Sequence, residues 1–360
     1  MKKIISIVLA MTVAMTLVAC GGASTAKMTM GTGGTAGTYY GYGGVLGQYI
    51  KNKAGIDVTV VSTDGSKANI QGIAAGDYQL GTVQSDVMAY AYNGTSLFEG
   101  APVEGFSTVA ALYMEQVQIV TLDPEIKTVA DLAGKKVSIG AAGSGVYFNA
   151  IDILGVYGLT EADIVPTYQG FGDSANALKD GQIDAAFVVA GAPTTAITDL
   201  ATTKDVHLVA LDDEHVAKLL ETSPYYAKNV ISADTYTGLD GDVTTVAVGA
   251  VVLAANTVSE DAVYALCADI FDNAADLVSS HAKYGELIQN LENVEDSAGQ
   301  IADFALEGQT VAQQIEMLAG LCKADADRAM QSLFSPDRMT WMLILPDGSA
   351  DMEEEEDEAE

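Results

Sequence analysis

Residues 31–44 read GTGGTAGTYYGYGG, and the interpretation of the rest of the chain starts from this glycine-rich stretch. An apolar strand candidate, Met28 to Met30, precedes it, and a helical pattern that begins at Val45 follows it. Glycine permits close backbone approach, and a loop between a strand and a helix start presents backbone N–H groups to an anion. The stretch lacks the Gly-Lys-Ser/Thr of a Walker A loop, and no ribose-binding acid follows it. We therefore expect an anion-binding loop, with a plain flexible linker as the alternative.

The composition limits the class of protein. A chain of 360 residues is long enough for two domains, and 49% hydrophobic residues exclude a largely disordered protein. The 17 Lys and Arg residues face 49 Asp and Glu residues, for a formal net charge of -32. This balance argues against nucleic acid and against an anionic membrane surface as partners.

The N-terminus has the pattern of an export signal. Two lysines are followed by an apolar segment at 4–18, which is too short for a confident membrane span. The segment ends in LVACG at 17–21, which resembles a bacterial lipobox, so we expect a lipoprotein signal peptide at 1–19 and lipidation of Cys20. Residues 20–27 would then tether the chain to the cell membrane on its extracytoplasmic face. An ordinary secretory signal is the alternative.

A repeating unit follows the glycine-rich stretch. Strand candidates at 57–61 and 78–83 each end in a small polar loop that opens a helix, at 62–69 and 84–86. In an α/β sheet such loops gather at the carboxyl ends of the strands, where ligands bind.

The same unit returns later in the chain. A strand at 137–140 is followed by AAGSG at 141–145 and a helix at 147–157. This second anion-presenting loop predicts two α/β lobes that face one cleft. Further strands are expected at 165–168, 185–189 and 207–211, with loops at 170–172 and 190–193.

Two apolar segments are suited to cross between the lobes. Strand candidates at 108–113 and 116–122 include the first crossing, and 243–255 is the second. Two crossings make a two-segment hinge that lets lobes close over a ligand. An amphipathic helix at 259–278 is expected to pack on the first lobe. The expected division is lobe I at 28–115 and 245–345, lobe II at 116–244, and an acidic disordered tail at 346–360.

Several motifs in register resemble the solute-binding receptors of TRAP transporters of the TAXI type. They are the 31–44 stretch, GTVQSD at 81–86, DLAGKKVSIGAAGSG at 131–145, LKDGQIDAAFVVAG at 178–191 and SPYY at 223–226. The resemblance covers roughly residues 28 to 280 and fades beyond His281. It implies a type II periplasmic-binding-protein fold, a membrane permease as partner, and a small carboxylate or a glutamate-like amino acid as solute.

The loops of both lobes supply the expected ligand-binding residues. None of these loops contains an arginine, because the only two arginines in the chain are Arg328 and Arg338. The carboxylate of the solute must therefore be bound by neutral donors, by helix N-termini or by a lysine. Lys67 is the candidate lysine, but a solvated surface position is the simpler interpretation of it. The candidate residues are Gly37, Thr38, Tyr39, Gln84 and Ser85 from the first lobe, and Ser144, Gly145, Phe171, Ala190 and Gly191 from the second. Tyr225 or Tyr226 is expected at the rim.

Other chemistry has little support in the residues. The three histidines are scattered in the sequence, and no metal or cofactor is expected. Cys267 fits a buried core thiol, and Cys322 can form a disulfide with it only if the fold brings the two close together. Asp86 and Asp173 are better interpreted as helix starts than as catalytic acids, which argues against an enzyme. A surface lipoprotein or adhesin with a vestigial cleft remains the alternative function, supported by the long C-terminal segment.

Overall fold

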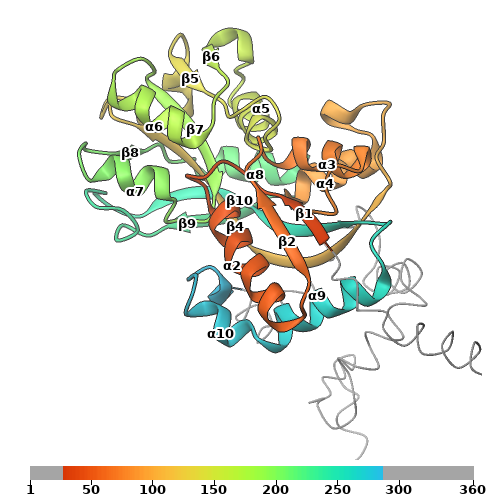
Figure 1. Cartoon of the computed structure of the whole chain (residues 1–360). Helices are drawn as coiled ribbons and strands as arrows, with labels where there is room; N and C mark the ends of the chain where they lie inside the picture. Colours follow the sequence, from red (N-terminus) through yellow and green to blue (C-terminus); the bar gives the residue numbers. More distant parts are fainter. Residues whose placement is uncertain (1–26, 287–360) are drawn as a thin grey trace, which may run out of the picture. The chain divides into compact units, whose positions relative to one another are not determined.

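The computed structural model describes residues 27–286 (Figure 1). The expected signal peptide, Cys20 and its tether, Cys322, the end of lobe I and the acidic tail lie outside the described residues. Within the described range, no helix has the length and apolar character needed to cross a bilayer.

Parallel strands and helices alternate in what we call the first half. Met30 of β1 pairs with Val60 of β2 and with Leu80 of β3, both in parallel register. β1 and β2 each lead through a short loop into a helix, and β3 runs directly into α4; helical crossovers are the connection that parallel strands require. The elements are β1 (Lys27–Gly31), α2 (Thr38–Lys53), β2 (Asp57–Val61), α3 (Ser66–Ala75), β3 (Leu80–Gln84) and α4 (Ser85–Asn93).

The second half repeats this plan around a wholly buried strand, β7. β5 pairs in parallel with β6 on one side and with β7 on the other. The elements are β5 (Lys136–Ser138), α5 (Val146–Val156), β6 (Val165–Thr167), α6 (Phe171–Lys179), β7 (Ala185–Ala190), α7 (Thr195–Ala201), β8 (His207–Leu208), α8 (Asp213–Thr222) and β9 (Ala227–Ile231).

Two long strands join the halves into one sheet. β4 (Phe106–Thr121) pairs antiparallel with β10 (Val243–Ala255) and, from Gln116 onward, with β7. β10 also pairs with β3 and β9, so the sheet runs β2-β1-β3-β10-β4-β7-β5-β6. The α/β class with crossing strands is therefore confirmed, whereas the exact lobe boundaries stay a prediction.

Helices cover both faces of each half (Figure 1). In the first half, α2 and α9 (Glu260–Asp272) bury apolar side chains on one face, and α3 and α4 bury theirs on the other. In the second half, α5 and α8 share one face, and α6 and α7 share the other.

The segment after α9 closes onto the first half. α10 (Ala274–Val278) leads to Tyr284, whose fully buried ring stacks on Tyr42 with the ring centroids 3.8 Å apart. The Tyr284 hydroxyl donates to the main-chain oxygen of Tyr42 at 2.9 Å.

Several expected element boundaries are wrong. α2 starts at Thr38 and not near Val45, so half of the glycine-rich stretch is helix. Tyr39 and Tyr42 are buried in the core, and this packing offsets the low helix propensity of the glycines. A Cβ on Gly43 would lie 2.8 Å from Cγ2 of Thr32, so glycine lets α2 pack closely there. The two strands expected at 108–113 and 116–122 are one strand, β4, because β10 pairs with it from Phe106 to Gln116, through two register shifts and across the expected break.

Two further differences concern the later chain. The single helix expected at 259–278 is two, with Asn273 in non-helical backbone between them. β9 was not expected, since its sequence AKNVI mixes polar and apolar residues without a clear strand signal.

Candidate functional site

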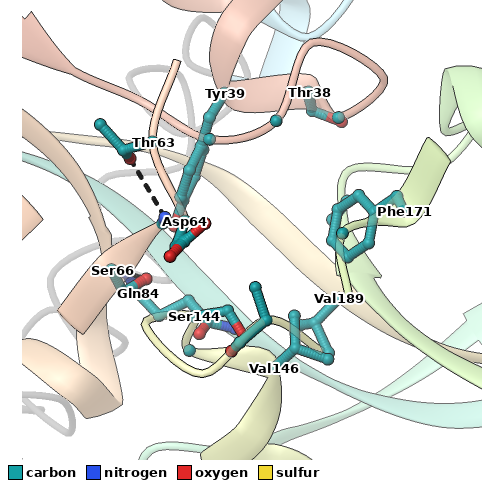
Figure 2. A pocket seen from close by; sticks show the side chains of 18 of the residues that line it. Thr38, Tyr39, Thr63, Asp64, Ser66, Gln84, Ser144, Val146, Phe171 and Val189 are labelled. Carbon is teal, nitrogen blue, oxygen red and sulfur yellow. Dashed lines mark hydrogen bonds between the residues drawn. The ribbon is translucent and has the colours of Figure 1, made fainter. Parts of the chain in front are cut away.

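A cavity of about 330 Å³ lies where the loops of the two halves meet (Figure 2). In Figure 2 the Tyr39 and Phe171 rings flank it from opposite sides, with Gln84 and Ser144 along a third. The lining residues are Gly33, Gly34, Gly37, Thr38, Tyr39, Ser62, Thr63, Asp64, Gly65, Ser66, Gln84, Glu115, Ala141, Ser144, Gly145, Val146, Gly170, Phe171, Asp173, Val189 and Ala190.

Four helices begin at the wall of this cavity. α2, α3, α5 and α6 start after Gly37, Gly65, Gly145 and Gly170, and all four glycines line the cavity. The first N–H groups of a helix have no intrahelical acceptor, and glycine has no side chain to cap them. The helix dipole adds partial positive charge at each start. The wall therefore offers backbone donors suited to an anionic group.

Three hydroxyl groups of the wall donate to the protein itself. Thr38 Oγ1 donates to the Gly191 carbonyl at 3.0 Å, Ser144 Oγ donates to the Ala141 carbonyl at 2.7 Å, and Ser62 Oγ donates to the Gly33 carbonyl at 3.0 Å. Since the protons of these three hydroxyls are used, they offer lone pairs to a ligand. Ser66 differs, because its Oγ accepts from the Gln84 N–H at 3.1 Å, and its hydroxyl can serve as a donor beside the backbone.

Three carboxyl groups also line the cavity. Asp64 and Asp173 are exposed, whereas Glu115, on crossing strand β4, is only 2% exposed. The Tyr39 hydroxyl donates to Glu115 Oε2 at 2.6 Å. Burial raises the pKa of Glu115 well above its usual range, and the Tyr39 hydrogen bond opposes that effect in part.

Gln84 connects the cavity to a buried polar cluster between the halves. Its Nε2 donates to Asn149 Oδ1 at 2.8 Å, and Asn149 Nδ2 donates to Asp86 Oδ2 and to the Tyr226 hydroxyl, both at 2.8 Å. The Tyr226 hydroxyl donates to Asp152 Oδ2 at 2.9 Å. Burial raises the pKa of Asp86 to about 7 and that of Asp152 to about 6.

Eight of the ten expected binding residues line the cavity, and two do not. Ser85 is turned toward the crossing strand, where its Oγ accepts from the Gly249 N–H at 3.1 Å. Gly191 is covered instead by Lys283, whose Cε would lie 2.6 Å from a Cβ at this position. Whether the other eight bind a solute stays a prediction.

The structure also places three residues that were discussed outside the list of ten. Tyr226 is buried in the polar cluster and not at the rim. Lys67 lies outside the lining, with Nζ 6.0 Å from the centroid of the Phe98 ring. Cys267 is half-buried, with Sγ 3.7 Å from the Val109 carbonyl oxygen, so it is less buried than the core position expected for it. Asp86 and Asp173 do lie in the first turns of α4 and α6.

Sequence reasoning missed the acidic part of the lining. Glu115 carried a usable signal, because it is the one charged residue within the strand 106–121. Asp64 and Gly65 belong to the expected loop at 62–69, from which only Lys67 was considered as a binding residue.

The model of the NMT1-like family matches residues 30–302, which is most of the chain. The chain belongs to the NMT1-like family.

Among solved structures, this NMT1-like chain is similar to the periplasmic aliphatic sulphonate binding protein SsuA from Escherichia coli, at 19% identity and a TM-score of 0.40 over 88% of this chain and 94% of that one. It is also similar to the GluR0 ligand-binding core from Nostoc punctiforme in complex with L-glutamate, at 14% identity and a TM-score of 0.45 over 71% and 98% of the two chains. These likenesses concern the fold alone. The strand order itself confirms the expected α/β architecture, in which two halves are joined by crossing strands.

Proposed function

We propose that the chain is an extracytoplasmic solute receptor that captures a small carboxylate between its two halves and delivers it to a membrane permease. The observation that carries this proposal is that four helices, each with a glycine at its N-cap position, begin at one cavity. Helix N-termini bind carboxylates through backbone N–H groups and the helix dipole. No lysine, arginine or histidine side chain is among the described residues that line the cavity, so these N–H groups are the principal donors.

The contacts around the cavity support capture by closure. The Ala68 N–H, on α3, donates to the Gly143 carbonyl of the second half at 3.0 Å, and a Cβ on Gly37 would lie 3.1 Å from the Phe171 ring. The halves touch here while β4 and β10 connect them behind the site, which is the arrangement that a hinge needs.

The transporter class and the anchor belong to the same proposal. The resemblance of the sequence motifs favours a TAXI-type TRAP permease as partner, and the lipobox favours an anchor on Cys20. We propose no turnover of the solute, since the wall offers hydrogen-bond groups without a paired nucleophile and base.

The test is a titration of the purified full chain by calorimetry and thermal unfolding with glutamate, glutamine, 2-oxoglutarate and dicarboxylates. A ligand at 100 times its dissociation constant stabilises the native state by about 2.7 kcal/mol, which a melting curve resolves. We expect heat and a raised melting temperature with at least one of these acids. No heat and no shift with any of them would contradict the proposal, and conversion of a bound acid would favour an enzyme.

A further inference from the structure

Lys283 is a buried cation that does not line the cavity. Its exposed fraction is 8%, its ammonium forms an ion pair with Glu286, and its Nζ lies 5.9 Å from the centroid of the Tyr113 ring. A buried ion pair adds little net stability, because desolvation offsets the attraction, but it can fix the position of a segment. The position of Lys283 is therefore the feature to explain.

Lys283 belongs to residues 281–286, which we call the clamp segment and which are anchored on the first half. The Tyr284 ring stacks on Tyr42 of α2 with the centroids 3.8 Å apart, and its hydroxyl donates to the Tyr42 carbonyl oxygen at 2.9 Å. Glu286 Oε2 accepts from the Met114 N–H at 3.2 Å. These contacts fix the clamp segment to α2 and to the part of β4 that precedes its pairing with β7.

From this anchored segment the Lys283 side chain reaches the second half. Gly191 directly follows β7, and a Cβ placed on it would lie 2.6 Å from Lys283 Cε and 3.1 Å from Lys283 Cδ. The aliphatic stem of the lysine makes this contact, as is common for long charged side chains. Thr38 Oγ1, at the start of α2, donates to the Gly191 carbonyl at 3.0 Å. Gly191 is therefore held from two positions of the first half.

Two main-chain hydrogen bonds report whether the halves are closed. The Ala68 N–H of α3 donates to the Gly143 carbonyl at 3.0 Å, and the Ala196 N–H of α7 donates to the Ala36 carbonyl at 3.2 Å. Both donors lie in the first turn of a helix, where an N–H has no intrahelical acceptor. Separation of the halves breaks both bonds and exposes both amides to solvent.

We propose that the clamp segment holds the two halves closed and that Lys283 is its positioning residue, which acts by packing its aliphatic stem on Gly191. The ion pair with Glu286 places the stem, and Tyr284 anchors the segment. Neither the motif resemblance, which fades beyond His281, nor any comparison with known proteins assigns a role to Lys283. The inference goes beyond the proposed function, because it concerns closure of the halves and not the identity of a solute.

The test is amide hydrogen exchange of the full chain without added solute, followed at Ala68 and Ala196. Lys283→Ala removes the stem, so both amides should exchange about fivefold faster, a usual effect of one lost packing contact on an opening equilibrium. Lys283→Met keeps an unbranched apolar stem without the charge and should stay within about twofold of the wild type. Lys218→Ala is the matched control, because Lys218 Nζ donates to the Val156 carbonyl within the second half.

The amides that pair β1 with β2 give the reference, because they lie within the first half and exchange only when it unfolds. A general structural role of Lys283 would accelerate these amides and leave Ala68 and Ala196 unchanged, which would overturn the inference. So would exchange at Ala68 and Ala196 that is no faster than at β1 in the wild type, or equal acceleration in Lys283→Met and Lys283→Ala.

A second variant covers the case in which Lys283→Ala does not fold. Tyr284→Phe removes the hydrogen bond to Tyr42 and loosens the anchor, so it must accelerate the same two amides or the inference fails. None of these outcomes depends on a solute, so the titration with small acids tests the receptor separately.

Discussion

The Tyr39 hydroxyl and Glu115 Oε2 lie 2.6 Å apart, in a hydrogen bond that joins the start of α2 to the crossing strand β4. It fixes the position of a buried carboxyl group at the wall of the cavity, 76 residues away in the chain. A motion of β4 during closure would therefore move both the helix start and the acid.

Tyr39→Phe should weaken both the site and the fold. The change removes the donor and leaves Glu115 Oε2 buried without a partner, which costs about 1–3 kcal/mol. The free energy of unfolding, measured by urea denaturation, should fall by that amount. Tyr40→Phe on the same helix is the control, because Tyr40 is 36% exposed. Equal values for the two variants would show that the hydrogen bond does not stabilise the fold.

Gly145→Ala should block the cavity. A Cβ at this position would lie 1.3 Å from Gln84 Oε1, so Gln84 or the start of α5 must move. We expect affinity for the solute to fall at least about tenfold, which corresponds to about 1.4 kcal/mol. Gly155→Ala on the exposed side of α5, where a Cβ meets nothing within 4 Å, should leave affinity unchanged. Unchanged affinity of Gly145→Ala for the solute would show that the solute binds elsewhere.

Gly43→Ala should destabilise the contact of α2 with the sheet. The added Cβ would lie 2.8 Å from Thr32 Cγ2, and such overpacking costs about 1–3 kcal/mol. Its neighbour Gly44 is exposed and open, so Gly44→Ala should stabilise α2 by about 0.5–1 kcal/mol. Chemical denaturation of both variants checks the opposite signs, and a loss of equal size in both would refute the packing explanation.

The polar cluster between the halves should make stability depend on pH. Burial raises the pKa of Asp86 to about 7 and that of Asp152 to about 6, against about 3.9 in the unfolded chain. The folded state therefore keeps protons that the unfolded state has lost, and the free energy of unfolding should fall as pH rises from about 4 to 7.

Asp86→Asn should flatten this dependence. At pH 8 the free energy of unfolding of the variant should exceed that of the wild type by at least about 1.4 kcal/mol, which is the energy that corresponds to a pKa shift of one unit. Asp199→Asn, at an exposed position of α7, is the control. A wild-type slope that persists in Asp86→Asn would show that another group is responsible, with Glu115 as the next to test.

The sequence was sufficient for the cavity's glycine loops because glycine, serine and threonine follow strand candidates in both halves. It was insufficient for helix boundaries and residue positions that depend on tertiary packing. The start of α2 at Thr38 depends on the burial of Tyr39 and Tyr42 against distant parts of the chain, and no local signal reports that burial. Gly191 was chosen from its loop, yet Lys283, 92 positions later, covers it. Glu115 was missed because its burial follows from the pairing of β4 with β10 and β7, which is a long-range property.

Mass spectrometry of small molecules released by denaturation from the purified full chain tests the central claim most directly. We predict a single small carboxylate, near one per chain in the wild type and depleted in Gly145→Ala, with Gly155→Ala as the control. The same amount of the molecule in Gly145→Ala as in the wild type would contradict the assignment of the cavity. A chain that releases no small acid and also binds none when titrated would contradict the claim that it is a solute receptor.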